Sequence, residues 1–249
     1  MIVEKSNRLN QATGGRDMAR HDGTIAVVTG AGHGIGRSIA SQLVAEGAAV
    51  AVLEIDESKG SETVSQIVGA GGRAVFVKAD ITNADQVESA FAAAEDALGP
   101  VSLLVNNAAF TAAGDLKGMS LHSWHREIDI NLHGTYHCIC AVLPRMRSRR
   151  GGAIVNIASV NGMRYFGNPS YSAAKAGIIN LTMSVASEFG RDGIRCNAVS
   201  PGCAHRQHHL DHSPAKGPGR LRETWPLVSA WPCRRADGHR QGCFLLRVQ

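Results

Sequence analysis

Strand-like and helix-like segments alternate along most of this 249-residue chain. Short apolar runs rich in β-branched residues end at glycine or polar residues, and amphipathic stretches of helical length separate them. Strands are expected near 24–29, 49–54, 73–78, 101–105, 153–158 and 194–199, and helices near 35–46, 57–69, 84–98, 123–149 and 171–190. This alternation predicts a single α/β domain, in which a doubly wound parallel sheet carries helices on both faces.

A glycine-rich turn directly follows the first expected strand. It reads G-A-G-H-G-I-G from Gly30 to Gly36 and leads straight into a helical pattern. Glycine permits positive φ and lets backbone N–H groups approach a pyrophosphate, although tight turns need glycine for structural reasons too. The second strand ends at Glu54, where an acid can accept a hydrogen bond from an adenosine ribose; a solvated strand end is the alternative.

Tyr171 and Lys175 place a phenol and an ammonium one helical turn apart, in the sequence Y-S-A-A-K. Side chains at i and i+4 share a helix face, with Cβ atoms about 5–6 Å apart. The lysine charge can therefore stabilise the phenolate and make the pair a proton-transfer device. Any amphipathic helix can contain Y-x-x-x-K by chance, so this interpretation depends on the other motifs.

Together, the motifs resemble those of the short-chain dehydrogenase/reductase family. They occur in the family's order over about 24–202: T-G-A-G-H-G-I-G from Thr29, Asp80 in K-A-D-I-T, N-N-A-A from Asn106, Asn131 in I-N-L-H-G-T, Ser159 in I-V-N-I-A-S, Y-S-A-A-K from Tyr171, and N-A-V-S-P-G ending at Gly202. Ala109 departs from the pattern, because the family usually has glycine after N-N-A. Alanine there is a small steric change, compatible with cofactor binding.

The resemblance implies a Rossmann-type domain over 23–202 that moves hydride between NAD and a secondary alcohol or ketone. Tyr171 would be the acid/base, and Lys175 would lower its pKa and bind the nicotinamide ribose. Ser159 would hold the substrate oxygen, and Asn131 would support a proton-relay water. Cofactor contacts are expected from Gly30, Gly34, Ile35, Gly36, Glu54, Asp80, Ile81, Asn107, Ala108, Tyr171, Lys175, Pro201 and Gly202.

Within that set, the three glycines would receive the pyrophosphate, Asp80 the adenine and Asn107 the adenosine-side ribose. NAD is expected rather than NADP, because Glu54 would repel a 2′-phosphate and no arginine follows at 55–57. His33 is the one basic side chain in the glycine turn. The resemblance also implies a homodimer formed through the helices near 123–149 and 171–190.

The net charge of +5 comes entirely from the last part of the chain. Residues 1–202 carry 18 basic and 18 acidic side chains, whereas 203–249 carry 8 and 3. A neutral body does not support a nucleic-acid surface, which needs a concentrated basic face. The basic run at 145–150 suits the C-terminal end of a helix instead. A nucleic-acid binder with a basic tail is therefore the weakest of the functional hypotheses.

Residues 203–249 break the alternation. They hold five of the eleven histidines and four of the eight prolines, without sustained helical or strand periodicity. The family's threonine after Pro-Gly, its substrate-covering helix and its final strand are not readable here. An atypical, poorly ordered tail is predicted, either from a change of reading frame near 203–205 or from natural divergence. Histidines at 205, 208, 209 and 212 have metal-ligand spacing, but tail composition explains them and no metal site is predicted.

Further expectations concern the N-terminal segment, the location of the protein, its partner and the loss of the lid. Residues 1–22 are polar and predict a disordered leader without a secretory signal, with Met18 as an alternative start. Scattered cysteines and the lack of an 18-residue apolar run favour the cytoplasm, with no membrane span. A small-molecule alcohol or ketone is the expected partner. The alternative function is a cofactor-binding protein with impaired catalysis, because the substrate lid is lost.

Overall fold

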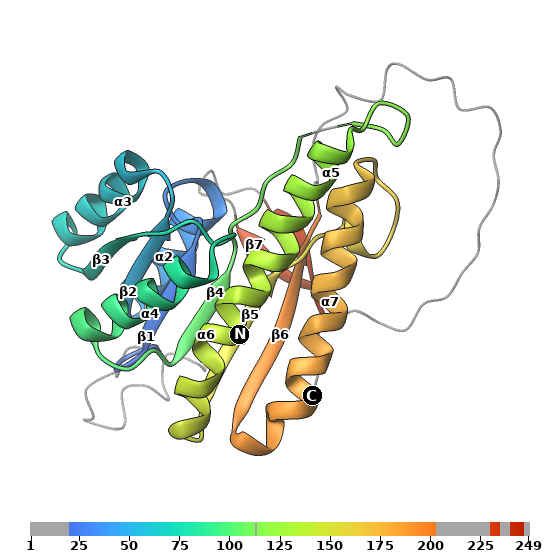
Figure 1. Ribbon diagram of the computed structural model, residues 1–249. Coiled ribbons are helices and arrows are strands. Elements are labelled where there is room, and N and C mark those ends of the chain that lie inside the picture. The colour runs from blue at the N-terminus through green and yellow to red at the C-terminus, as the bar shows by residue number, and fades with distance from the viewer. Residues whose placement is uncertain (1–19, 113, 203–229, 235–239, 247–249) are drawn as a thin grey trace, which may run out of the picture.

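The computed structural model describes residues 20–112, 114–202, 230–234 and 240–246 (Figure 1). Its elements in chain order are β1 (Ile25–Thr29), α2 (Gly34–Ala45), β2 (Ala49–Glu54), α3 (Glu57–Gly69), β3 (Arg73–Lys78), α4 (Ala84–Leu98), β4 (Leu103–Asn106), α5 (Leu121–Ile128), the π-helical segment η1 (Asp129–His133), α6 (Gly134–Ser148), β5 (Gly152–Ile157), the 3₁₀ turn η2 (Val160–Gly162), α7 (Pro169–Phe189), the 3₁₀ turn η3 (Gly190–Asp192), β6 (Ile194–Pro201), β7 (Ala230–Arg234) and β8 (Arg240–Leu246).

The strands form one sheet in the order β3-β2-β1-β4-β5-β6-β8-β7. The first six are parallel, which confirms the predicted doubly wound α/β sheet. The order reverses between β1 and β4, where Val27 pairs with Ala51 on one side and with Leu104 on the other. Ligands bind beyond the carboxyl ends of strands at such a switch point, so the topology already locates the site.

The core lies on both faces of the sheet because successive strand side chains point in opposite directions. Val27 faces the layer of α4, α6 and α7, where it belongs to one buried cluster with Phe91 and Ile139. Val28 faces α2 and α3, in a second cluster that includes Ile67. Strands β1 and β2 are buried throughout, as expected for central parallel strands covered on both sides.

The helix expected near 123–149 is interrupted. Helix α5 ends at Ile128, η1 inserts a wider π-helical turn around Asn131, and α6 begins only at Gly134. The Asn131 side chain bonds to both backbone groups of Phe110, which lies in the loop after β4. Single π-helical turns are frequent at functional sites, and apolar periodicity does not reveal them.

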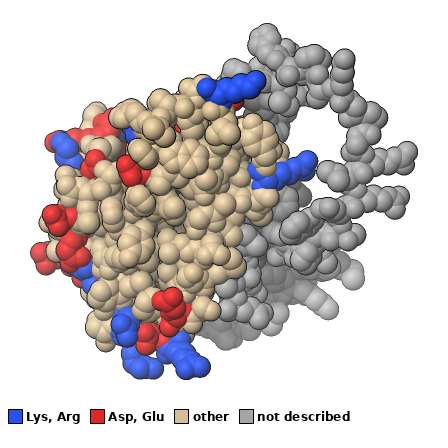
Figure 2. Space-filling view, turned by 45° about the vertical axis from the view of Figure 1, so that its right-hand side comes forward, with Lys and Arg blue, Asp and Glu red and all other residues tan. Residues whose placement is uncertain are grey.

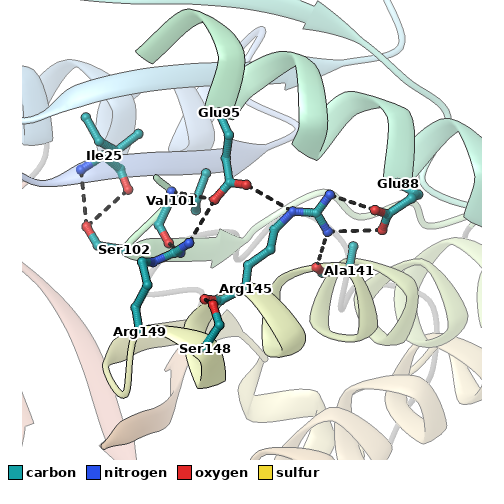
Figure 3. A network of polar contacts seen from close by, with 9 residues as sticks. All are labelled: Ile25, Glu88, Glu95, Val101, Ser102, Ala141, Arg145, Ser148 and Arg149. Carbon is teal, nitrogen blue, oxygen red and sulfur yellow. Dashed lines mark hydrogen bonds and ion pairs between the residues drawn. The ribbon is translucent and has the colours of Figure 1, made fainter. Parts of the chain in front are cut away.

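The basic run at the end of α6 is largely paired with acids (Figure 3). Arg145 contacts Glu88 at 2.6 Å and Glu95 at 3.1 Å, so that α6 is joined to α4. Arg149 approaches Glu95 at 3.3 Å and also donates to the carbonyl of Val101. These arginines therefore hold two helices and the entry to β4 together.

Two strands lie within the segment where the sequence predicted no regular element. Strand β8 pairs antiparallel with β6, and β7 pairs antiparallel with β8 at the edge of the sheet. β7 contains Pro232 and β8 contains Gly242, residues that are unfavourable in strands and weaken the strand pattern in the sequence. Proline is tolerated in β7 because an edge strand leaves some N–H groups without a ladder partner. The segment where the family has its threonine and substrate-covering helix, and the four histidines at 205, 208, 209 and 212, lie outside the described residues.

The described chain begins three residues before the end of the expected leader, which otherwise lies outside it. His21 donates its backbone N–H to the backbone carbonyl of Glu46 at 2.8 Å, and its ring nitrogen lies 3.4 Å from the Glu46 carboxylate. Residues 20–22 thus form a turn packed against the end of α2 instead of belonging to the leader. None of the helices that the structure describes has the length and apolar content needed to cross a bilayer.

Candidate functional site

A pocket of about 790 Å³ opens at the carboxyl ends of the parallel strands. This is within the size range of small-molecule and cofactor sites. Most of the predicted site residues line it: Gly30, Gly34, Ile35, Glu54, Asp80, Ile81, Asn107, Ala108, Ser159, Tyr171, Lys175, Pro201 and Gly202. Gly36 and Asn131 are the two predicted residues that do not. Motifs more than 170 positions apart in the sequence therefore meet in one cavity.

The glycine turn has the backbone that a phosphate cradle needs. Gly30 and Gly34 have φ values of 61° and 55°, a region that favours glycine. A Cβ on Gly36 would lie under 3 Å from the carbonyl oxygen of Gly30 and from Asn107 Nδ2, so the turn and α2 pack without room for a side chain. His33 caps α2 without a side-chain hydrogen bond, and the first turn holds no acid. The amides there fit a pyrophosphate.

Glu54 lies at the end of β2 with 7% of its surface exposed. Its Oε2 accepts from Gly32 N at 3.0 Å, and Oε1 accepts from the backbone of Ile55 and Asp56 at 3.0 and 3.2 Å. A carboxylate can accept about four hydrogen bonds, so one site remains for a ribose hydroxyl. Lys59 also lines the pocket, but it pairs with Asp56 at 2.7 Å.

Asn107 and Asp80 both use polar atoms to fix loops. Asn107 Nδ2 donates to the carbonyls of Thr29 and Gly30 at 3.0 and 3.1 Å, so it holds the glycine turn. Asp80 Oδ1 accepts from the amide and hydroxyl of Thr82 at 2.9 and 2.8 Å. Because these atoms are engaged, the Oδ1 of Asn107 and the Oδ2 of Asp80 are the atoms left for a ligand.

The catalytic candidates lie on the other side of the pocket. Lys175 Nζ is 5.4 Å from the centroid of the Tyr171 ring and donates to the carbonyl of Ile157 at 2.7 Å. Only 2% of Lys175 is exposed, and burial lowers the pKa of its ammonium to about 8. Ser159, two residues after the end of β5, accepts from Asn161 N at 3.2 Å and caps η2.

Asn131 is fully buried, and its side chain bonds to backbone groups. Oδ1 accepts from Phe110 N at 3.2 Å, while Nδ2 donates to the carbonyls of Phe110 and Glu127 at 2.7 and 2.8 Å. The side chain therefore holds the loop after β4 in place. The backbone carbonyl of Asn131 also accepts from the Thr135 hydroxyl at 2.9 Å.

Several pocket residues were missed by sequence reasoning. Arg126 lies over the ring of Phe110 at 4.4 Å, and both line the pocket with Ile130. Glu127, beside them in α5, is fully buried. One signal was available for Glu127, since it precedes Asn131 by four positions and must share its helix face. Nothing in the sequence placed Phe110 or Arg126 at the cavity.

Comparison with known proteins accounts for this arrangement. The family profile described as short chain dehydrogenase matches residues 24–213. This chain belongs to the short-chain dehydrogenase family. A 3-oxoacyl-[acyl-carrier-protein] reductase from Synechocystis sp. is 41% identical over 182 residues, which cover 72% of this chain and 73% of that protein.

Other short-chain dehydrogenases support the same assignment. A 3beta-hydroxysteroid dehydrogenase from Mediterraneibacter gnavus is 37% identical, over 76% of this chain and 68% of that protein. The crystal structure of a short-chain dehydrogenase/reductase described as putative, from Burkholderia xenovorans, superposes with a TM-score of 0.73 at 36% identity, over 75% of this chain and 77% of that one. The chain is therefore an oxidoreductase of this family with the family's fold.

Proposed function

We propose that the protein interconverts a secondary alcohol and a ketone with NAD as cofactor, using Ser159, Tyr171 and Lys175. The observation that carries the proposal is the meeting of these three side chains with the glycine turn and Glu54 in one pocket. A phenol beside a buried ammonium supports acid/base chemistry, and the glycine backbone supports dinucleotide binding.

The proposed roles follow from the contacts of each residue. Bound NAD supplies the redox chemistry, since its nicotinamide accepts or donates a hydride. Tyr171 removes the hydroxyl proton during alcohol oxidation and returns it during ketone reduction. Lys175, with a pKa of about 8, still carries its proton at neutral pH and stabilises the phenolate electrostatically. Ser159 orients the substrate oxygen toward Tyr171.

The preference for NAD rests on the charge at the end of β2. Glu54 keeps one acceptor site for a ribose hydroxyl, and its charge opposes a 2′-phosphate. The nearest lysine, Lys59, is already paired with Asp56. His33 is the remaining basic side chain in the adenosine half of the pocket.

The substrate class can be approached through the relatives. One is named as a reductase of 3-oxoacyl groups and another as a dehydrogenase of 3beta-hydroxysteroids, and both groups contain a secondary alcohol or ketone. We include both in the proposed test. The second candidate function is cofactor binding with impaired turnover, which rests on the unusual composition after Gly202.

The test measures turnover of 3-oxoacyl thioesters, hydroxysteroids and simple secondary alcohols with NAD(H) and NADP(H). Tyr171→Phe should lower kcat about a thousandfold, because only the acid/base hydroxyl is lost. Tyr165→Phe is the matched control, since that tyrosine is 73% exposed outside the pocket. Retention of most activity in Tyr171→Phe would contradict the mechanism. Tight cofactor binding without turnover of any panel member would favour the second candidate.

The assembly we propose is a homodimer through α6 and α7. Exposed residues on this surface include Tyr136, Cys140, Ala176 and Met183, and these four are uncharged. In Figure 2 the charged side chains lie mainly near the margins, while the middle of the view is almost free of them. Light scattering tests the dimer. A cytoplasmic location is supported by the free thiols of Cys138, Cys140 and Cys196.

A further inference from the structure

Glu127 is a fully buried carboxylate in α5. Its Oε1 accepts from Ala112 N at 2.6 Å and from Asn168 Nδ2 at 3.3 Å, and its Oε2 accepts from Ser170 Oγ at 2.8 Å. Among the described residues no cation pairs with it, and the neighbouring Arg126 lies over Phe110 instead. Burial of a carboxylate among neutral donors is costly unless those hydrogen bonds are made. The donors therefore show which segments of the fold Glu127 holds in place.

The donors belong to two segments that border the pocket. Ala112 lies in the loop after β4, 15 positions before Glu127, whereas Ser170 lies in the first turn of α7, 43 positions after it. Asn131 shares the helix face of Glu127 and holds Phe110 in the same loop. The two side chains together bind this loop, and Glu127 alone extends the connection to α7.

The link to α7 passes through a residue with an uncommon backbone conformation. Asn168 caps α7 with φ 48° and ψ 83°, in the left-handed region. Its Oδ1 accepts from Tyr171 N at 3.2 Å, and its Nδ2 donates to Glu127 and to Thr111 Oγ1. A carboxylate only accepts hydrogen bonds. Glu127 therefore requires the amide nitrogen of Asn168 to face it, so that the amide oxygen faces the backbone of Tyr171.

We propose that Glu127 is a positioning residue for Tyr171. Its Oε1 sets the orientation of the Asn168 amide, which fixes the first turn of α7 and thereby the side chain of Tyr171. Lys175 follows one turn later, where the carbonyl of Ile157 already holds it. This inference rests on the proposed function for its catalytic consequence, but the structural part can be measured without turnover.

Two variants separate positioning from packing. Glu127→Met removes every acceptor and keeps the shape, and replacement of a buried charge by an apolar isostere is commonly tolerated by the fold. Glu127→Gln keeps an oxygen for Ala112 and Asn168, because Ser170 can turn its hydroxyl toward Asn168 Oδ1 at 3.2 Å. Thr182→Val is the matched control: it removes buried hydrogen bonds from the same helix, away from the pocket lining.

Amide hydrogen exchange without substrate is the first readout. In Glu127→Met the amides of Ala112 and Tyr171 should exchange about tenfold faster, since each loses a fixed acceptor. Glu127→Gln and Thr182→Val should leave both amides protected. In turnover, kcat of Glu127→Met should fall about thirtyfold with cofactor affinity unchanged, because a misplaced acid/base costs rate without removing binding contacts.

The two outcomes are separable. Wild-type exchange at Ala112 and Tyr171 in Glu127→Met, or wild-type kcat in that variant, would overturn the positioning role even if Tyr171→Phe is inactive. A wild-type protein with no turnover contradicts the proposed function instead, and hydrogen exchange then decides the inference about Glu127. A similar loss of kcat in Thr182→Val would also overturn the inference, since any disturbance of α7 would then suffice.

Discussion

The adenosine half and the catalytic half of the pocket are assembled differently. The first uses mainly backbone from one short stretch: the glycine turn follows β1, and Glu54 at the end of β2 reaches back 22 positions to Gly32. Asn107 is a distant side chain that holds this turn, 77 positions after Gly30. The second uses side chains from separate elements, fixed by distant partners. Ser170 reaches Glu127 over 43 positions, and Asn168 reaches Thr111 over 57.

This difference predicts how each half fails. A local backbone cradle is disturbed by steric change at its own glycines, which should affect cofactor affinity. The catalytic half depends on charge and on orientation, which should affect rate more than affinity. Lys175 is the exception, because it is proposed to serve both the phenolate and the nicotinamide ribose.

Lys175→Met should have the largest effect and should weaken both catalysis and cofactor binding. We expect kcat/KM to fall about a thousandfold, on the order of 4 kcal/mol, since the cation beside Tyr171 and the ribose contact are both lost. Steady-state kinetics and cofactor titration measure the two losses separately. Lys117→Met removes an exposed lysine as the control. An unchanged cofactor affinity would mean that Lys175 serves the catalytic half alone.

The same substitution should stabilise the cofactor-free protein. Burial lowers the pKa of Lys175 from 10.5 to about 8, so between these values the unfolded chain binds more protons than the folded one. The cost of the buried charge is therefore fully present below pH 8 and is relieved as pH rises to 10.5. At pH 7 Lys175→Met should gain on the order of 3 kcal/mol in free energy of unfolding. Denaturant unfolding of both proteins from pH 7 to 10.5 measures this gain. A gain in the free energy of unfolding that did not shrink as the pH rises would contradict the prediction.

Gly36→Ala should damage only the adenosine half. The new Cβ would lie under 3 Å from the carbonyl oxygen of Gly30, so the turn must shift. Such overpacking costs about 2 kcal/mol, which corresponds to about thirtyfold weaker cofactor binding. Gly69→Ala is the control, because nothing lies within 4 Å of a Cβ there. A loss of kcat at saturating cofactor that equals the loss of cofactor affinity would show that the two halves are coupled.

Glu54→Gln should have the smallest effect and should change selectivity. The charge that opposes a 2′-phosphate disappears, while one oxygen remains to accept from the backbone. We expect the ratio of NAD to NADP affinity to fall about tenfold, or about 1.4 kcal/mol. Glu57→Gln, three positions along and outside the pocket, is the control. Tighter binding of NADP than of NAD by the wild type would reverse the interpretation of Glu54.

Much of the fold and most of the pocket could be predicted from the sequence. Strand patterns gave the six parallel strands, and of the predicted site residues only Gly36 and Asn131 fall outside the cavity lining. Gly36 instead packs against the glycine turn. The engagement of Asn107 with that turn could not be predicted, because its partners Thr29 and Gly30 come from a different strand end.

Other features escaped prediction because their signals are weak or absent. The π-helical turn at Asp129–His133 leaves the apolar periodicity almost unchanged. Strands β7 and β8 contain proline or glycine, and the sheet edge that accommodates them is a property of the neighbouring strands. Glu127 looks like any charged helix residue until its burial is known.

The order of residues specifies the parallel sheet, the glycine turn and the spacing of Tyr171 and Lys175, because periodicity, φ preference and helix pitch act between near neighbours. Which polar atoms are hydrogen-bonded in the site depends on the packing of the folded chain. It buried Lys175 enough to lower its pKa to about 8, and it brought Glu127 to the cap of α7. Desolvation and long-range hydrogen bonding depend on what the folded chain packs around a group, which residue order alone does not specify.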